Sequence, residues 1–487
     1  MPGVGRQCLG CVAGRLALRA ASVKDGAKQR KLTGPTFMNE HNAPHGPPTL
    51  LRILGLVFGL AVVVGGMVGS GIMRAPGVVA KGINSPPLIL LAWVIGGLVA
   101  LISAMPLVEA GASVPMAGGA YPIARRAFGP TAGFLTGWIS WLQYVASNAF
   151  IAVVFGEYVH RLGMAPRVST SVLAVALIAG VSLVNLLGTR ISGSSQSVAS
   201  AIKGAAFIVL AVVLFASKHA PPMPTLADHA SALVGVTSLG GLVMAIRVIY
   251  QTYAGWDAAI YFSEEVKRPD RNVARATFGG IAAVMLLYVV VNAAVLHVLD
   301  PAAIAGSELA VGDAAKVSLG SIADTVITAM GLFSLAAIVN LQTMAAPRIT
   351  FRMARDGAAP TALARVAPGG APWLGVVVAS CGAALFAATG SYESIVRIYA
   401  PWTMAAIMVI CLCAIRLRVV EPDLPRPWKM PLFPWIAVLG AAIQASLILV
   451  VVLDDPVAGL LSAIAAVAPL PLYFLLTGAW KRGAEGL

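Results

Sequence analysis

Long apolar runs, separated by short polar segments, follow one another along most of the chain. A transmembrane helix needs roughly 20 predominantly apolar residues to cross the hydrocarbon core of a bilayer, and about twelve runs of that length can be placed here. Because the runs are continuously apolar and do not alternate in two-residue steps, they predict an all-α membrane protein rather than a β-barrel. The predicted spans cover residues 52–80, 87–110, 131–158, 170–188, 196–217, 236–262, 276–299, 318–346, 372–389, 394–416, 432–453 and 457–479.

The composition is that of a protein whose solvent is lipid. Charged residues make up 11% of the 487 residues and hydrophobic residues 58%, and the mean hydropathy is +0.85. In an ordinary soluble chain, charged residues are about a quarter of the total. This chain could not cover itself with a polar surface in water, so we expect residues 51–480 to form a transmembrane domain.

The N-terminal segment differs from the rest of the chain. The first 37 residues lack the apolar core of a signal peptide and are rich in Gly, Arg and Lys. We therefore expect residues 1–50 to be a disordered cytoplasmic tail. Met38, just before the first span, is an alternative start. Cys8 and Cys11 form an isolated CxxC with no second pair and no flanking His, which favours neither a metal site nor a disulfide.

The net charge of +14 indicates membrane topology rather than nucleic-acid binding. With an even number of spans, both ends of the chain lie on the same side of the membrane. The tail and the alternate loops on that side hold 25 of the 34 Lys and Arg residues. Cytoplasmic loops of membrane proteins are enriched in Lys and Arg. We therefore place both termini in the cytoplasm and the protein in the cytoplasmic (inner) membrane, with the lipid bilayer as a partner and no nucleic acid.

Glycine-rich interruptions occur in two of the predicted spans. The first span contains GGMVGSGI at residues 65–72, and the sixth contains YQTYAGWD at residues 250–257. In lipid every backbone polar group needs a partner inside the protein, so a membrane helix breaks only where it lines a cavity. A broken helix leaves free N–H groups on one side of the break and free carbonyls on the other. These groups suit the carboxylate and the ammonium of an amino acid.

Close helix packing through small residues is the alternative explanation of such glycines. The two interruptions, however, fall in spans one and six, which correspond to each other if five helices are repeated in inverted orientation. Paired interruptions of this kind point to the substrate site of a transporter. The pattern therefore predicts a binding site near the midplane of the membrane, between the two broken helices.

Four segments carry a resemblance to a known family. They read VGSGIMRAPG (68–77), PMAGGAYPIARRAFGPTAGFLTGWISWLQY (115–144), YAGWDAAIYFSEEVKRPDRNVARA (253–276) and APRITFRMARDGAAP (346–360). From about residue 52 to the last span, the chain resembles the amino acid–polyamine–organocation (APC) permeases, especially the branch with bacterial amino-acid permeases and the light chains of heteromeric exchangers. The resemblance implies a core of two inverted five-helix repeats with broken helices one and six, plus two further helices.

The resemblance also implies the residues of the site. In the first span the substrate carboxylate is expected at Met67, Val68, Gly69, Ser70, Gly71 and Ile72. In the sixth span the predicted site comprises Gln251, Thr252, Tyr253, Ala254, Gly255 and Trp256. There the carbonyls of Gln251 and Ala254 are expected to hold the ammonium, and the side chains of Gln251, Tyr253 and Trp256 to shape the side-chain pocket or an occlusion gate. Family members commonly carry an aromatic gate at the position of Gln251. The glutamine departs from that pattern, which argues against both a gate at this position and a strongly apolar substrate preference; Tyr250 is an alternative gate.

Two ionisable residues at membrane depth are candidate coupling groups. Lys203 lies in the first half of span five. In sodium-independent members of the family a lysine here takes the place of a cation and touches span-one carbonyls, and a desolvated lysine can also release a proton. The alternative is a side chain that reaches back to the interface. Asp257 follows the second break, where it could cap freed N–H groups or carry a proton.

The composition of the charged loop after span six predicts a solvated cytoplasmic segment, and the resemblance implies that this loop also acts as an inner gate. Its charged residues are Glu264, Glu265, Lys267, Arg268, Asp270 and Arg271.

Other classes of function lack their sequence signals. An enzyme would need clustered catalytic or metal-binding groups, but the six His are dispersed, and no nucleotide-binding GxxxxGK[ST] loop occurs. Nor does the sequence show the charged or carbonyl-rich ring of a channel. We therefore expect a secondary transporter of amino acids, with no cofactor or metal, coupled to protons or working by exchange. Transport of polyamines or other small organic amines is the alternative. The particular amino acid and the oligomeric state stay open.

Overall fold

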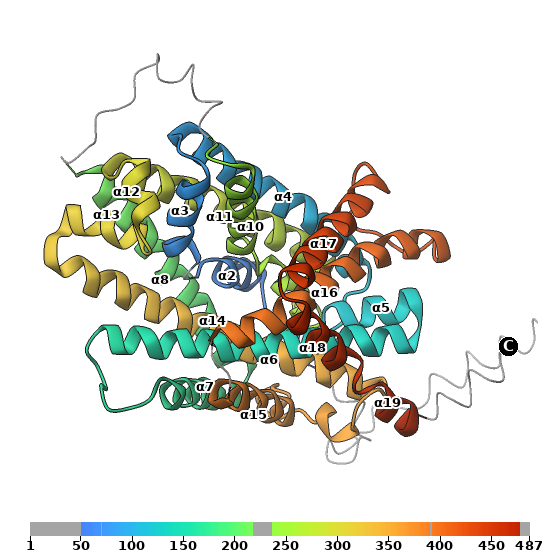
Figure 1. Cartoon of the computed structure of the whole chain (residues 1–487). Helices are drawn as coiled ribbons and strands as arrows, with labels where there is room; N and C mark the ends of the chain where they lie inside the picture. The colour runs from blue at the N-terminus through green and yellow to red at the C-terminus, as the bar shows by residue number, and fades with distance from the viewer. Residues whose placement is uncertain (1–49, 70, 218–235, 390–391, 478–487) are drawn as a thin grey trace, which may run out of the picture. The chain divides into compact units, whose positions relative to one another are not determined.

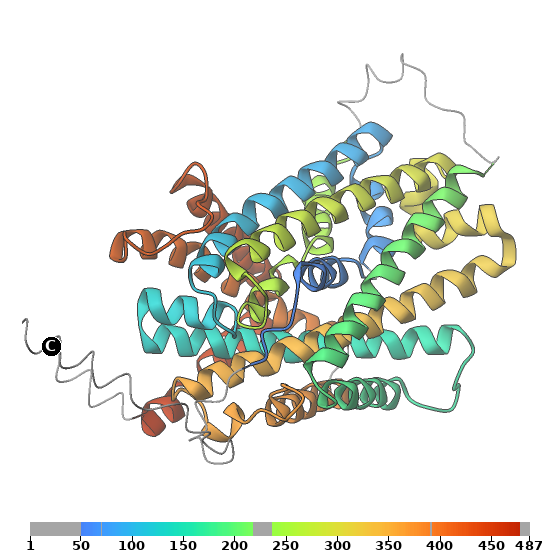
Figure 2. The ribbon, with the colours of Figure 1, turned by 180° about the vertical axis from the view of Figure 1, so that it is seen from behind.

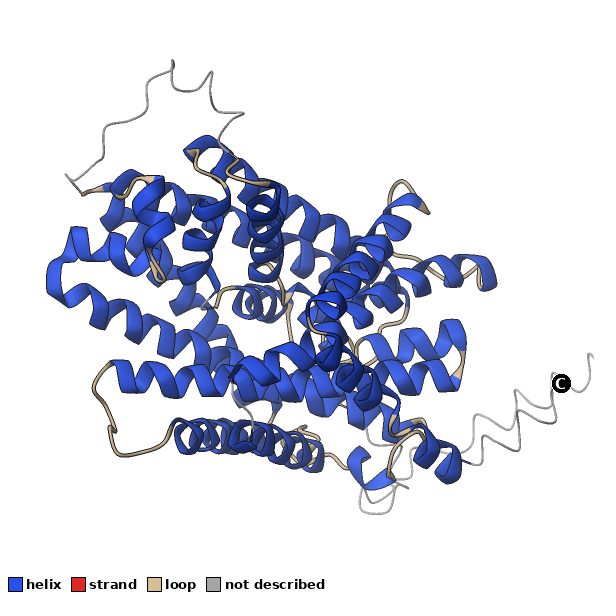
Figure 3. Cartoon of the chain, viewed as in Figure 1, coloured by secondary structure: helices blue, strands red, loops and turns tan. Residues whose placement is uncertain are grey.

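The computed structural model describes residues 50–69, 71–217, 236–389 and 392–477. These residues form helices joined by turns (Figure 3). The only β-pairing among them is two isolated bridges, Leu54 with Val266 and Ile83 with Val236. The expected all-helical class is therefore confirmed for this part of the chain. The predicted tail, its CxxC and Ser70 lie outside the described residues.

The helices follow one another from residue 56 to residue 477. In chain order they are α2 (Leu56–Met67), α3 (Gly71–Gly82), α4 (Pro86–Ser113), α5 (Ala120–Phe128), α6 (Pro130–Arg161), α7 (Thr170–Leu186), α8 (Thr189–Phe215), α10 (Leu239–Thr252), α11 (Pro269–Val298), α12 (Pro301–Gly306), α13 (Ala310–Leu319), α14 (Ala323–Arg355), α15 (Trp373–Thr389), α16 (Tyr392–Val420), α17 (Trp435–Asp454), α18 (Pro456–Val467) and α19 (Leu470–Thr477), with the 3₁₀ segments η3 (Trp256–Phe262), η4 (Gly320–Ile322) and η5 (Thr361–Ala364). Several begin with proline, whose missing N–H is harmless at the first helical position.

By length and composition, the described residues contain eight helices able to cross a membrane, or nine if the bent pair α2 and α3 is one span. The eight are α4, α6, α8, α11, α13 with α14, α16 from Arg397, α17, and α18 with most of α19. The other three predicted spans fall on α7, on α15 and on α10 with η3. Both α7 and α15 are apolar but shorter, and α10 has only 14 residues before the chain turns into η3.

Several helices extend beyond the apolar runs that predicted them. Helix α8 begins at Thr189 rather than at residue 196, α11 begins at Pro269 rather than at residue 276, and α14 continues to Arg355 rather than ending at residue 346. The added turns carry polar and charged residues, some of them exposed and others, such as Arg348, buried against neighbouring segments. A hydropathy pattern therefore does not include them, although the backbone stays helical.

The first broken helix is surrounded by other helices. Helix α2 contacts α8, α11, α14 and η3, and it lies in the middle of the view in Figure 1. Helices α4 and α11 run side by side (Figure 2). Helix α6 packs against α14 and α16, and α7 and α15 lie against it. The interruption therefore faces protein rather than lipid, as the backbone chemistry of a break requires.

Large apolar side chains cover the outside of several spans. On α8, Val209 and Val212 are 62% and 61% exposed, and on α17, Leu449 and Leu453 are 58% and 70% exposed. An apolar surface of this extent is suited to lipid and not to water. Together with the apolar spans, it defines an integral membrane protein.

Candidate functional site

The first interruption separates α2 from α3. Helix α2 ends at Met67, α3 begins at Gly71, and the two axes are bent by 47°. The last carbonyls of α2 have no partner in a following turn. Side chains from three other helices supply donors to them.

Lys203 on α8 is the charged donor. Its side chain is 2% exposed, and Nζ donates to the carbonyl oxygens of Gly65 at 2.9 Å and Val68 at 2.6 Å. Ser334 Oγ on α14 donates to the same Val68 oxygen at 3.1 Å. Lys203 therefore lies inside the protein, against span one, and does not reach for the interface.

The second interruption is a short turn between α10 and η3. Gly255 adopts φ +106°, a backbone conformation that L side chains rarely adopt. A Cβ atom at Gly255 would lie 2.7 Å from the carbonyl carbon and oxygen of Gly66, and a Cβ at Gly66 would lie 2.9 Å from the Gly255 oxygen. The two breaks thus touch through bare backbone, which only glycine at both positions allows.

Tyr288 on α11 joins the two breaks. Its hydroxyl lies 2.7 Å from the Met67 oxygen and 3.1 Å from the Thr252 oxygen, and it is the donor to both. Its ring packs against Trp93 and Tyr253, with centroid separations of 5.5 and 5.1 Å. One buried side chain therefore meets a freed carbonyl of each broken helix.

A cavity of about 380 Å³ opens between the breaks and helices α6, α14, α16 and α17. The predicted site residues that line it are Met67, Gly69, Gly71, Gln251, Thr252, Ala254, Gly255, Trp256 and Asp257. Of the predicted residues that the structure describes, Val68, Ile72, Lys203 and Tyr253 do not. Val68 and Ile72 are buried in packing, and Tyr253 turns its hydroxyl away, to the Trp93 oxygen at 2.9 Å. The expectation that the Tyr253 side chain shapes the pocket is not met by this geometry.

Two contacts describe the polar groups at the second break. The Gln251 carbonyl already accepts from the Ala254 N–H at 3.1 Å, which leaves one of its lone pairs. Asp257 does not supply the cap of η3, whose N-cap is Gly255 with no side-chain bond. Its carboxyl interacts instead with the Tyr144 hydroxyl. Asp257 and Tyr144 therefore lie next to each other in the lining of the cavity.

The loop after η3 is less solvated than its charge suggested. Glu265 is fully buried and paired with Arg348 on α14 through both carboxylate oxygens, one of them 2.8 Å from Nη2. Glu264 is partly buried, and its Oε1 accepts from Arg355 Nη1 at 2.7 Å. The expectation of a solvated loop is wrong for these two residues, because both find arginines on α14. It holds for the exposed residues Lys267, Arg268, Asp270 and Arg271.

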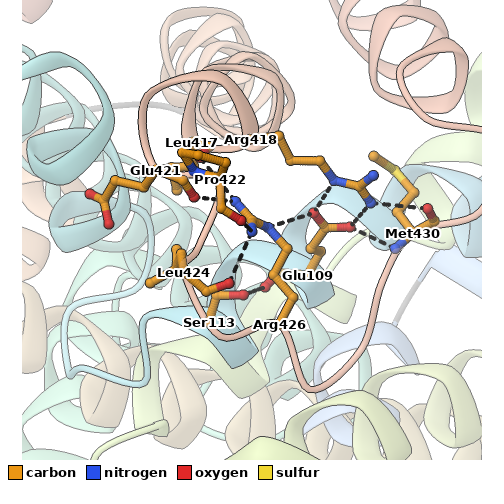
Figure 4. A network of polar contacts seen from close by, with 9 residues as sticks. All are labelled: Glu109, Ser113, Leu417, Arg418, Glu421, Pro422, Leu424, Arg426 and Met430. Carbon is orange, nitrogen blue, oxygen red and sulfur yellow. Dashed lines mark hydrogen bonds and ion pairs between the residues drawn. The ribbon is translucent and has the colours of Figure 1, made fainter.

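A second buried acid, which is not among the residues predicted from the sequence, lies on α4. Figure 4 shows Glu109 bound to Arg418 at 2.7 and 2.6 Å, with the Met430 N–H at 2.6 Å and Arg426 at 3.6 Å. These partners tie α4 to α16 and to the segment before α17. The available signal was an acidic residue within an apolar span, which is uncommon without a partner.

Glu421, also drawn in Figure 4, follows α16 and pairs with Arg126 on α5. The Arg126 guanidinium donates to it at 2.9 and 2.6 Å, and these hydrogen bonds hold the pKa of the Glu421 carboxyl below its ordinary value. Because the pair is partly exposed to solvent, it contributes little to stability.

The described residues thus form a helical membrane protein in which two interrupted helices and their neighbours surround a cavity lined by both polar and apolar residues. Residues 54–473 match the family model described as "Amino acid permease", and the chain belongs to this family. The resemblance found in the motifs is therefore confirmed. The protein is a transporter and not an enzyme.

Individual relatives are similar along most of their length. The "Serine/threonine exchanger SteT" of Bacillus subtilis (strain 168) is 26% identical over 446 residues, which cover 90% of this chain and 98% of the relative. The mouse "b(0,+)-type amino acid transporter 1" is 27% identical over 436 residues, covering 85% and 86%. The mouse "Large neutral amino acids transporter small subunit 2" is 26% identical over 473 residues, covering 93% and 87%.

Proposed function

We propose that the protein is a sodium-independent secondary transporter that moves amino acids across the cytoplasmic membrane by alternating access, coupled to protons or to exchange. Its core is two inverted five-helix repeats with two further helices, and both termini are cytoplasmic. The eight or nine long apolar spans, with three shorter pieces at the other predicted positions, support about twelve crossings. The asymmetric distribution of Lys and Arg supports the orientation.

In this proposal the two breaks hold the two ends of the substrate. The first N–H groups of α3, next to Gly69, Ser70 and Gly71, bind the carboxylate, because a helix N-terminus favours an anion. The carbonyl of Ala254, with the remaining lone pair of Gln251, binds the ammonium. The presence of both segments at one cavity supports this assignment. Asp257, at the same wall, is the candidate proton carrier.

The observation that carries the sodium independence is the position of the Lys203 ammonium. It already binds the Gly65 and Val68 carbonyls, which would otherwise attract a cation such as sodium. Exchange of one amino acid for another is supported by the Bacillus subtilis relative, which is named as a serine/threonine exchanger.

The test is counterflow of labelled amino acids into liposomes that contain the purified full-length protein, with sodium replaced by choline and with several imposed pH gradients. We expect uptake without sodium. Lys203→Met should insert but transport about tenfold less or worse, because each unpaired carbonyl costs about 1–3 kcal/mol. Lys203→Arg should keep at most a fraction of the activity, since the buried space fits a compact ammonium.

Lys81→Met is the matched control, because Lys81 is exposed at the end of α3 and the same charge is removed there. It should transport like the unmodified protein. No uptake of any amino acid would refute the transport proposal. Uptake that vanished without sodium, or normal transport by Lys203→Met, would refute the role given to the ammonium.

A further inference from the structure

Four polar residues that line the cavity come from helices other than the broken ones. They are Gln143 on α6, Gln342 on α14, Thr403 on α16 and Gln444 on α17. None of them is among the residues predicted from the sequence. Each lies in an apolar helix, where a polar side chain facing lipid would be costly.

Each of the four carries a buried polar atom with no hydrogen-bond partner among the described residues. These atoms are Oε1 of the three glutamines and Oγ1 of Thr403. The amide nitrogens of two of these glutamines do have hydrogen-bond partners. Gln342 Nε2 donates to Ser147 Oγ at 2.8 Å, and Gln444 Nε2 donates to the Tyr250 hydroxyl. Exchanging the oxygen and nitrogen of either amide would still leave one end unpaired.

The energetics of these atoms discriminate between kinds of substrate side chain. A buried polar group without a partner costs about 1–3 kcal/mol, and buried polar groups in proteins are nearly always paired. A hydrocarbon side chain that filled the cavity would leave all four atoms unpaired. A hydroxyl or a carboxamide could donate to and accept from them.

The charges at the cavity do not favour an ionic side chain. Arg74 and Asp257 both line it, so the wall carries one formal charge of each sign. An acidic or a basic substrate side chain would meet attraction from one and repulsion from the other. The neutral polar residues then decide the selection.

We infer that the cavity selects amino acids whose side chain ends in an uncharged hydrogen-bonding group, a hydroxyl or a carboxamide, and that Gln342 and Gln444 make the selecting contacts. This inference rests on the proposed transport of amino acids and names the substrate class. A site built to hydrogen-bond a substrate group rejects the analogue that lacks it, whereas an apolar pocket separates such pairs weakly.

The experiment measures binding of matched amino acids to the purified full-length protein in detergent by calorimetry. Threonine and valine have nearly the same shape, as do asparagine and leucine, so each pair isolates the hydrogen-bonding group. We expect the polar member to bind at least about tenfold more tightly in both pairs. In Gln342→Met and Gln444→Met the side-chain length is kept and the amide is lost. The ratio of the affinity for the polar amino acid to the affinity for its apolar partner should therefore move toward one in both pairs.

Asn148→Leu is the matched control. Asn148 is also a buried amide with an unpaired oxygen, and it donates to Thr343, but it does not line the cavity. Its ratios should stay as in the unmodified protein. If Asn148→Leu reduced the two affinity ratios as much as Gln342→Met does, the selection would not come from the glutamines that line the cavity.

The possible outcomes distinguish a failure of this inference from a failure of the proposed amino-acid transport. If no amino acid binds, the proposed function fails. If amino acids bind but valine and leucine equal threonine and asparagine, amino-acid binding stands, water alone pairs the four atoms, and the inference is overturned. Because threonine is compared with valine and asparagine with leucine in the unmodified protein, the inference can be tested even if a methionine variant does not fold.

Discussion

Lys203, Tyr288 and Ser334 reach the freed backbone carbonyls of the first break from three different helices. The sequence predicted the first of these contacts, because a charge within an apolar run is conspicuous and the family resemblance supplied its partner. Tyr288 and Ser334 could not be predicted in the same way. Tyrosine and serine are ordinary in membrane helices, and their partners lie 221 and 266 residues away along the chain.

Tyr288→Phe should leave the protein folded but weaken transport. The change removes one hydroxyl and keeps the ring that packs on Trp93 and Tyr253. The Met67 and Thr252 carbonyls then lose their shared donor, at about 1–3 kcal/mol for an unsatisfied buried acceptor. Because these carbonyls belong to the two broken helices, we expect a several-fold loss of substrate affinity, measured by binding, together with a lower melting temperature.

Tyr158→Phe is the control for that variant. The Tyr158 hydroxyl is buried but has no hydrogen-bond partner among the described residues, so its removal should be neutral or slightly stabilising. Equal effects of the two substitutions on affinity would show that Tyr288 does not act through the breaks.

At the scale of helices, both interruptions were predictable from glycine in an otherwise apolar run. The structure places them at α2 with α3 and at α10 with η3. The contact between them was not predictable, because the close approach of Gly66 to Gly255 depends on how two distant segments pack. The exact ends of α8, α11 and α14 were missed for a different reason: their end turns are polar, so the apolar run stops before the helix does.

Gly255→Ala should disrupt the second break. Alanine would have to adopt φ +106°, and its Cβ would lie 2.7 Å from the Gly66 carbonyl. Strain of this kind costs on the order of 1–3 kcal/mol before any clash is counted. We therefore expect a clearly lower melting temperature in detergent and little or no transport.

Gly204→Ala is the matched substitution in a regular helix. Gly204 lies in α8, and a Cβ there would meet nothing within 4 Å, so alanine should be neutral or stabilising by up to about 1 kcal/mol. Normal stability and transport in Gly255→Ala would contradict the contact between the breaks.

At the scale of the whole chain, two buried carboxylates connect segments that are far apart in sequence. Glu265 binds Arg348 across 83 positions, and Glu109 binds Arg418 across 309. The positive charges of the loops predicted topology, but they could not show which arginines turn inward. That depends on the position of an acid on a neighbouring helix, and on the fold that brings the two together.

The Glu265–Arg348 pair should behave as one unit in a double-mutant cycle of unfolding. Both side chains are nearly fully buried, at 0% and 3% exposure, so Arg348→Met leaves an uncompensated carboxylate, at about 3–5 kcal/mol. Glu265→Gln leaves the guanidinium uncompensated in the same way. The double variant removes both charges, so we expect it to unfold at a higher temperature than Arg348→Met alone.

The exposed pair between Arg161 and Asp324 provides the comparison. It joins α6 to α14 at 2.5 Å, but its side chains are 42% and 35% exposed, and exposed pairs contribute only about 0–1 kcal/mol. Arg161→Met should therefore lower the melting temperature far less than Arg348→Met, and added salt should remove what difference it makes. The interpretation fails if the two arginine variants unfold at the same temperature, or if the double variant is as unstable as the two single effects added together, because the buried charges would then act independently.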